Sequence, residues 1–253
     1  MRRLLACLSA FVLLLGVGQA KGDTFGFSVR FGEDQLYSIN LNTGASTPIG
    51  PVGHGVVLGL SFQPGTGTLY GVDGDTGTLI TIDTTTGAGT VIGPLGIGTN
   101  FGAGLTFDAS GNLYLAYEGG ENFFSVNPST GAASLIGNMG QSVAGLAALQ
   151  GTVYGFADTP DHNLVTINTE TGAATTVGPL NWPVRISYGG ISFDGSGTLW
   201  GVFDNGTATI NTTTGTATGI ANLDPGFASL AIIPEPATAA LLLFGGLAAI
   251  RRR

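Results

Sequence analysis

The chain has 253 residues, of which 44 are glycine and only 9% are charged. Apolar residues recur along its whole length, which argues against a disordered chain, and all-β proteins of this size often form a single domain. Residues 21–236 carry all 16 acidic side chains against three basic ones, a net charge of −13. Such a body repels phosphate backbones, so we expect no nucleic-acid partner.

The first twenty residues have the pattern of a secretory signal peptide. Arg2 and Arg3 precede an apolar run at 4–17, and small residues end at Ala20. We therefore expect residues 1–20 to be a signal peptide that is cleaved after Ala20. The single cysteine, Cys7, lies inside this segment. The exported body would then have no thiol for a disulfide, a thiolate metal site or a cysteine nucleophile.

The body, residues 21–233, repeats one turn motif five times. The five copies read SINLNTGA, TIDTTTGA, SVNPSTGA, TINTETGA and TINTTTGT, and their glycines are Gly44, Gly87, Gly131, Gly172 and Gly215. An aromatic series has the same count: Phe25, Tyr70, Tyr114, Tyr154 and Trp200. A third series occupies 59–62, 104–107, 145–148, 190–193 and 229–232. Three series with one count indicate five structural units.

Each unit contains four short strands. In the second unit the strands are expected at 69–73, 78–83, 89–93 and 103–108, and Gly87 supplies the positive φ that a tight hairpin needs. Four strands in about 43 residues is the size of a propeller blade. These features predict an all-β, five-bladed β-propeller, with a β-solenoid as the alternative.

The two ends of the body predict how the ring closes. The first unit begins with a strand of the second type, TFGFSV, and the last ends in FASLAII, an inner-type strand without a successor. The N- and C-terminal strands together would complete the last blade and protect the sheet edges. FDASGNLYLAY and FDGSGTLWGVF resemble the signature of NHL-like propellers over most of 23–233. That resemblance implies the architecture and no particular activity.

The tail, residues 234–253, combines three features in a fixed order. Pro234, Glu235 and Pro236 precede an apolar segment at 237–250, and the chain ends in three arginines: Arg251, Arg252 and Arg253. Fourteen helical residues rise about 21 Å, less than the roughly 30 Å hydrocarbon core. The arginines would keep this end in the cytoplasm. A plain single-pass anchor remains an alternative.

The tail resembles the PEP-CTERM sorting signal of Gram-negative bacteria. The resemblance implies a transmembrane helix, processing near Pro234–Pro236 by an exosortase-like enzyme, and transient residence in the inner membrane. It further implies a final place on the cell surface or in the extracellular matrix, with an exopolysaccharide or envelope glycan as partner. Such a signal is an address and indicates no activity.

Asp73 and Asp75 are the candidate metal ligands of the body. They lie two apart in DGDTG, which is similar to the start of a calcium loop, but the glutamate of an EF-hand is missing. A surface Ca²⁺ site and simple turn capping both stay open, and we otherwise expect no cofactor. Neither His54 nor His162 belongs to a catalytic sequence pattern.

Further acids end predicted strands or interrupt the repeat. Asp108 and Asp194 follow inner strands at the position of Gln63, where turn motifs predict a structural role. Glu118 and Glu121 lie in an irregular EGGEN loop, for which a solvated role is the default.

The loop between residues 180 and 189 is the richest of the five connections between units. It carries Trp182, Arg185 and Tyr188, and aromatic faces with an arginine suit a sugar ring. The competing interpretation is a buried Trp182 that covers a blade edge. We expect a noncatalytic binding or structural protein. The alternative is a secreted hydrolase or lactonase with a divalent metal in the central channel.

Overall fold

The computed structural model of the chain describes residues 22–97, 103–117, 120–157, 162–183, 186 and 189–233. The predicted signal peptide with Ala20 and the whole predicted sorting signal lie outside these ranges. Arg185, Tyr188 and Glu118 lie outside them as well. Within the described ranges, no helix has the length and hydropathy required to cross a membrane.

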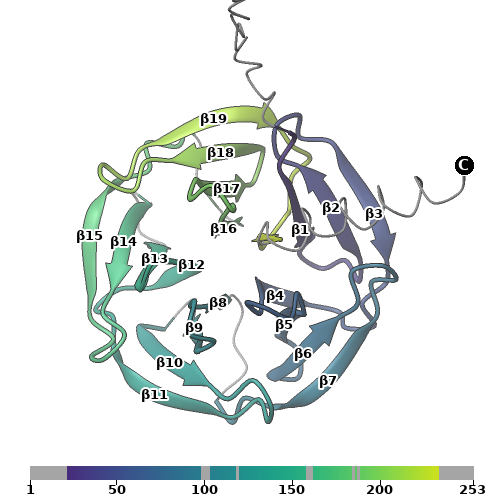
Figure 1. Ribbon diagram of the computed structural model, residues 1–253, viewed down its shortest axis with the longest axis vertical. Coiled ribbons are helices and arrows are strands. Elements are labelled where there is room, and N and C mark those ends of the chain that lie inside the picture. The colour runs from purple at the N-terminus through teal and green to yellow at the C-terminus, as the bar shows by residue number, and fades with distance from the viewer. Residues whose placement is uncertain are drawn as a thin grey trace, which may run out of the picture.

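Twenty strands form five antiparallel sheets of four strands, arranged as blades around a central axis (Figure 1). Blade 1 contains β20 (Ala231–Ile232), β1 (Phe25–Val29), β2 (Leu36–Asn40) and β3 (Ser46–Gly50). Blade 2 contains β4 (Val57–Phe62), β5 (Leu69–Asp73), β6 (Thr78–Ile82) and β7 (Gly89–Pro94). Blade 3 contains β8 (Ala103–Phe107), β9 (Leu113–Tyr117), β10 (Asn122–Val126) and β11 (Ala133–Asn138).

The remaining strands form two further blades. Blade 4 contains β12 (Val143–Leu149), β13 (Thr152–Ala157), β14 (Asn163–Ile167) and β15 (Ala174–Pro179). Blade 5 contains β16 (Gly189–Phe193), β17 (Leu199–Phe203), β18 (Gly206–Ile210) and β19 (Ala217–Asn222). The predicted five-bladed propeller with four strands per blade is confirmed, and the solenoid alternative is wrong.

Blade 1 closes the ring with strands from both ends of the body, as predicted. β20 pairs with β1 through Gly26 opposite Ile232 and Phe27 opposite Ala231. Ahead of β20, the amide of Ala228 donates to the carbonyl of Val29 at 2.9 Å. The closing strand is short, so this connecting segment supplies part of the closure.

The register of β1 corrects one member of the aromatic series. Tyr70 lies opposite Thr81 in its blade, and the corresponding position opposite Ser38 in blade 1 is Phe27, not Phe25. Phe25 is 52% exposed, whereas Phe27 is buried. Phe25 and Gly26 have the same aromatic-glycine order as Tyr70 and Gly71, so the sequence alone favoured Phe25. Only the pairing with β2 distinguishes the two phenylalanines.

The aromatic series packs one blade against the next. Three edge-to-face pairs join neighbouring blades: Phe27 with Phe62, Tyr70 with Phe107, and Tyr154 with Phe193, at centroid distances of 5.6, 5.1 and 5.5 Å. In each pair the second ring is the last aromatic residue of the following inner strand. Such pairs stabilise a fold by about 0.5–1.5 kcal/mol beyond their buried area.

The repeated turn glycine also joins the blades at the outer rim. Gly87 has φ +86°, and a Cβ there would lie 2.3 Å from the carbonyl oxygen of Gly50 in the preceding blade. The amide of Gly89 donates to the carbonyl of Val52 at 2.8 Å in the same contact between blades 1 and 2, which we call a seam. Equivalent glycine contacts join the later blades: Gly131 with Gly93, Gly172 with Gly137, and Gly215 with Gly178. The motif therefore builds both a hairpin and a seam, and the repeat pattern predicted only the hairpin.

Candidate functional site

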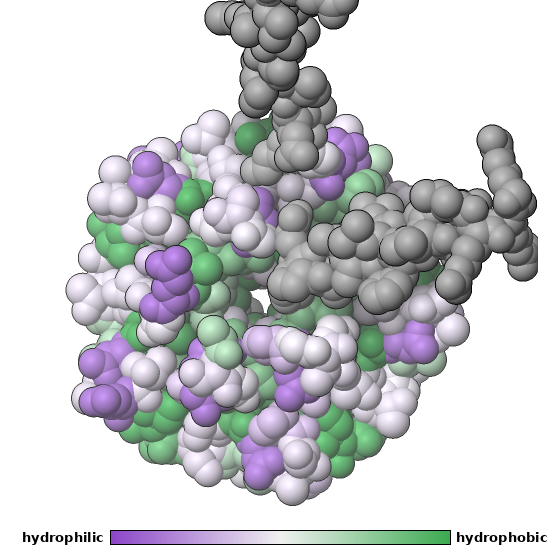
Figure 2. Space-filling view, in the orientation of Figure 1, coloured by the Kyte–Doolittle hydropathy of each residue, from purple (hydrophilic) through white to green (hydrophobic). Residues whose placement is uncertain are grey.

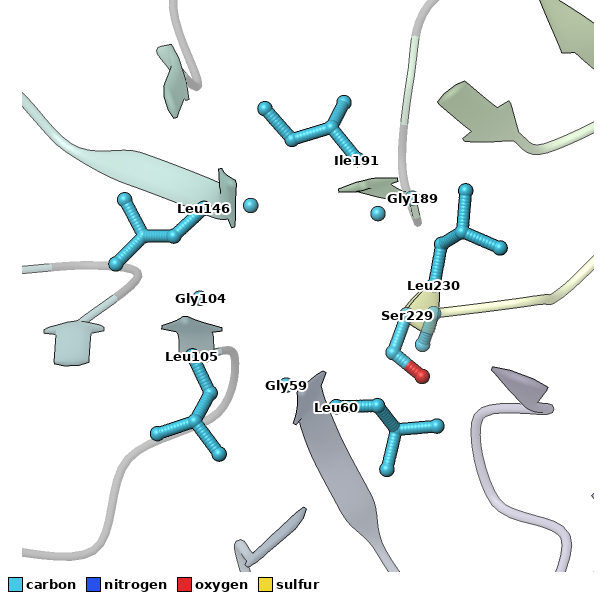
Figure 3. Close-up of a pocket in the computed structure, with 12 residues that line it drawn as sticks. Gly59, Leu60, Gly104, Leu105, Leu146, Gly189, Ile191, Ser229 and Leu230 are labelled. Atoms are coloured by element: carbon cyan, nitrogen blue, oxygen red, sulfur yellow. The ribbon is translucent and has the colours of Figure 1, made fainter. Parts of the chain in front are cut away.

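The central channel is lined by the inner strands and contains a small pocket. Glycines face the axis, while the side chains of Leu60, Leu105 and Leu146 point away from it into the gaps between blades (Figure 3). The cavity volume is about 10 Å³. Figure 2 shows a hollow at the centre of the ring. That volume is about what one water molecule needs, so this pocket is too small for a sugar ring.

The glycines of the inner strands are required by this close approach. A Cβ at Gly104 would lie 2.8 Å from Cγ of Leu146, and one at Gly190 would lie 2.3 Å from the amide nitrogen of Leu230. Among the described residues that line the channel, Ser229 carries the only polar side chain, and its hydroxyl is buried without a partner there. The lining thus offers no carboxylate to a divalent metal.

Asp108 and Asp194 cap turns, as their sequence context predicts. Oδ1 of Asp194 accepts from the amides of Ser196 and Thr198, each at 2.9 Å, and Oδ2 accepts from Trp200 Nε1 at 3.0 Å. Burial alone would raise the pKa of Asp194, but these donors and the Ser196 hydroxyl outweigh it and lower the pKa. Asp108 accepts from the amides of Ser110 and Asn112, both at 2.9 Å.

Asp73 is buried at the end of β5 and is saturated with hydrogen-bond donors. Its Oδ2 lies 2.8 Å from Nδ1 of His54 and 2.6 Å from the hydroxyl of Thr76, while Oδ1 accepts from the amides of Asp75 and Thr76. Burial raises the pKa of Asp73, and the bonds from Thr76, His54 and the two amides more than reverse this, so the pKa is lowered. These contacts cap the turn.

Asp73 and Asp75 remain the predicted Ca²⁺ ligands, and a cation would have to displace the donors already present. The described residues contain no group of three or more His, Cys, Asp or Glu side chains arranged to hold a metal ion. Glu121, from the EGGEN loop, is exposed just before β10.

Trp182 borders a cavity of about 370 Å³ on blade 5 that is open to solvent. The indole is half-buried and packs on Phe203, with ring centroids 5.2 Å apart. Beneath it lie two glycines: a Cβ at Gly206 would come within 3.3 Å of the indole, and one at Gly219 within 3.7 Å. The described lining consists of Trp182, Pro183, Asn205, Gly206, Gly219, Ile220, Ala221 and Asn222. Trp182 therefore covers the blade and also forms one wall of a cavity.

The loop that carries Trp182 is anchored on both sides. Leu180 is fully buried, donates to the carbonyl of His162 at 3.1 Å and accepts from Ala217 at 2.8 Å. Further along, the amide of Ile186 donates to Nε2 of His162 at 3.2 Å. His162 therefore holds the loop in place, and no catalytic partner of it is observed among the described residues.

Of the described cavity residues, the sequence singled out only Trp182; the residues that it missed include Asn205, Asn222, Gly206 and Gly219. A signal was nevertheless present in the repeat. The position of Gly219 is held by Val91 in blade 2, Leu135 in blade 3 and Thr176 in blade 4. The position of Gly206 is held by Thr78, Asn122 and Asn163 in those blades. Blade 5 lacks both side chains, and the Trp182 indole lies 3.3 and 3.7 Å from where their Cβ atoms would be.

Comparisons with known proteins show the fold alone. No protein family and no curated protein matches the chain. Among solved structures, a chain of the nidogen/laminin complex is similar over 84% of this chain and 98% of its own length, with a TM-score of 0.55 and 12% identity.

Two further solved structures are similar over smaller shares. Virginiamycin B lyase from Staphylococcus aureus matches 79% of this chain and 66% of its own, at a TM-score of 0.49 and 16% identity. A structural-genomics protein from Bacteroides thetaiotaomicron matches 66% of this chain and 53% of its own, at 0.49 and 19%. At identities of 12–19%, these likenesses show the fold and assign no activity.

Proposed function

We propose that this protein is an exported, noncatalytic binding or structural β-propeller of the cell surface or exopolysaccharide layer. The observation that carries the proposal is the contrast between the pocket in the central channel and the cavity at Trp182. The pocket in the channel has about 10 Å³, and Ser229 is the only described residue of its lining with a polar side chain. The cavity at Trp182 has about 370 Å³, within the size range of ligand sites.

Export and surface sorting are supported by the two ends of the sequence. The basic and apolar segment that ends at Ala20 supports secretion, and the order Pro234–Pro236, apolar segment and Arg251–Arg253 supports processing by an exosortase-like enzyme. Mass spectrometry of the protein from its producing cell tests both. We expect a new N-terminus at Lys21 and loss of the terminal arginines. An intact tail would instead favour a retained anchor.

The alternative function, a hydrolase or lactonase with a channel metal, gains no support from the residues around the channel. Such a metal needs several oxygen or nitrogen ligands, and the described lining provides only the hydroxyl of Ser229 as a polar side chain. Asp108 and Asp194 are occupied as turn caps.

Cosedimentation of the purified full chain with the exopolysaccharide of the producing cell tests the binding function. We expect saturable binding that is unchanged when EDTA replaces calcium. Parallel incubations should leave the polysaccharide chain length unchanged. Release of shorter chains would contradict the noncatalytic assignment, and absence of binding would leave only the structural role.

A further inference from the structure

We propose that the cavity on blade 5 binds one uncharged pyranose ring, with Trp182 as its aromatic wall and the amides of Asn205 and Asn222 as its polar contacts. This inference rests on the proposed binding function and adds to it the site and the class of sugar. Three properties of the cavity carry it: its shape, its charge and the unfavourable local structure that builds it.

The shape of the cavity suits a flat, amphipathic ring. The apolar side of a pyranose packs against aromatic rings and other apolar surface, and Trp182, Pro183 and Ile220 supply both. Gly206 and Gly219 remove the side chains that would otherwise fill the floor. Asn205 and Asn222 lie in the lining, and each amide offers donors and an acceptor for sugar hydroxyls.

The charge around the cavity selects against anionic sugars. None of the eight described lining residues is ionisable. Asp204 lies next to Asn205 in the chain, and residues 21–236 carry a net charge of −13. Apart from Arg185 of the same loop, which lies outside the described residues, this field would repel a carboxylate on the ligand, so a neutral hexose is favoured over a uronic acid.

Unfavourable backbone and side-chain features gather at the loop that places Trp182. Among the described residues only three non-glycine positions have positive φ, and two of them are here: Asn181 at 53° and His162 at 42°. The indole Nε1 of Trp182 and Nδ1 of His162 are buried without a hydrogen-bond partner in the described structure. Each such feature costs about 1–3 kcal/mol. Their concentration beside one cavity is typical of a site held in shape for a ligand.

Titration of the full chain with methyl glycosides, followed by saturation-transfer NMR, tests the inference. The probes are the methyl pyranosides of glucose, galactose and mannose, and methyl glucuronide as the anionic comparison. We expect at least one neutral glycoside to bind and the glucuronide to bind at least tenfold more weakly. A preference for the glucuronide, or no binding of any neutral glycoside, would overturn the proposal.

Three variants locate the site. Gly219→Thr restores the side chain that blade 4 carries at this position, and we expect it to weaken glycoside binding at least tenfold. Trp182→Ala should do the same. Asn205→Ala should weaken binding about three- to tenfold, as expected for one or two lost hydrogen bonds.

Thr176→Gly is the matched control, because it changes the equivalent position of blade 4 and should leave binding unchanged. Thermal unfolding of each variant separates loss of the site from loss of the fold. If Gly219→Thr still binds the glycosides like the parent, the site assignment is wrong. If that variant also keeps its exopolysaccharide binding, the binding function stands and uses another surface. Failure of the parent chain to bind exopolysaccharide would instead contradict the binding function itself.

Discussion

Blades 2 and 5 receive different side chains from the loops that precede them. His54 follows Gly44 by ten residues, and Trp182 follows Gly172 by the same number. In blade 2 the imidazole reaches the buried carboxylate of Asp73 at 2.8 Å. In blade 5 the indole lies over Gly206 and leaves a cavity beside it.

This difference separates the scaffold from the candidate site. The seams that join the blades use the same glycine contacts in every unit after the first, so they depend on the repeat. The cavity arises where blade 5 departs from the repeat, at Trp182, Gly206 and Gly219. In this propeller the repeated residues therefore build the ring, and the exceptions form the candidate site.

Breaking a seam should have the largest effect on stability. Gly87→Ala puts a Cβ at positive φ and 2.3 Å from the carbonyl oxygen of Gly50. We expect a loss of about 3 kcal/mol in the free energy of unfolding, from the left-handed backbone and from overpacking. Gly96→Ala is the control, because Gly96 has φ +72° but open space around it. It should lose about 1 kcal/mol. Urea denaturation measures both, and equal losses would contradict the seam.

Removing the contact that distinguishes blade 2 should have the next largest effect. Asp73→Asn weakens the bonds from His54 and Thr76, and we expect a loss of about 2 kcal/mol at pH 7. The pKa of Asp73 is lowered in the folded chain. Its stabilisation is therefore complete above the unfolded value of about 3.9, and it is lost as the pH falls through the folded pKa. Denaturation from pH 7 to 2 should show the two proteins converging in acid, and a constant difference would refute this.

The closure between blades 5 and 1 should be less sensitive to a single change. The guanidinium of Arg30 lies over the rings of Tyr37 and Phe227, at 5.1 and 4.7 Å from their centroids, and pairs with Asp224 at 3.1 Å. We expect Arg30→Met to cost about 1 kcal/mol in thermal unfolding. Asp224→Asn should cost less, because that carboxylate is exposed. The reverse order would mean that the ion pair dominates.

The smallest effect is expected at the outer-strand position where blade 5 has a glycine and blades 2 to 4 have a side chain. Leu135 is 62% exposed and corresponds to Gly219 in blade 5. Leu135→Thr should change the free energy of unfolding by less than about 0.5 kcal/mol in urea denaturation. A large loss of unfolding free energy would show that the side chain at this position stabilises the other blades. The glycine of blade 5 would then be a structural weakness with no bearing on a ligand.

The repeat spacing was enough to predict five blades, four strands in each and the closure by both ends. The turns could be predicted because their hydrogen bonds join residues that are close together in the sequence. In NTGA-type motifs the Asn or Asp and the Thr bond amides two or three residues away, as Asn168 does with Glu170 and Thr171. The register of Phe27 was missed, since it depends on a partner strand.

The candidate site was only partly predictable from the sequence. Trp182 was recognised from its residue type, whereas Asn205 and Asn222 looked like ordinary turn and strand-end residues. The alternative of a metal in the channel depends on which residues line it, and that lining follows from the packing of neighbouring inner strands. Its wall is built from five segments that are far apart in the chain.

The sequence by itself determined the number of blades, their hairpins and the way the ring closes, because those features follow from short-range hydrogen bonds and a period of about 43 residues. The tertiary structure decided the rest: which glycines join one blade to the next, how little space remains in the channel, and which residues meet at Trp182. These depend on distances between segments that the repeat does not encode, and they are set by how closely the blades can pack.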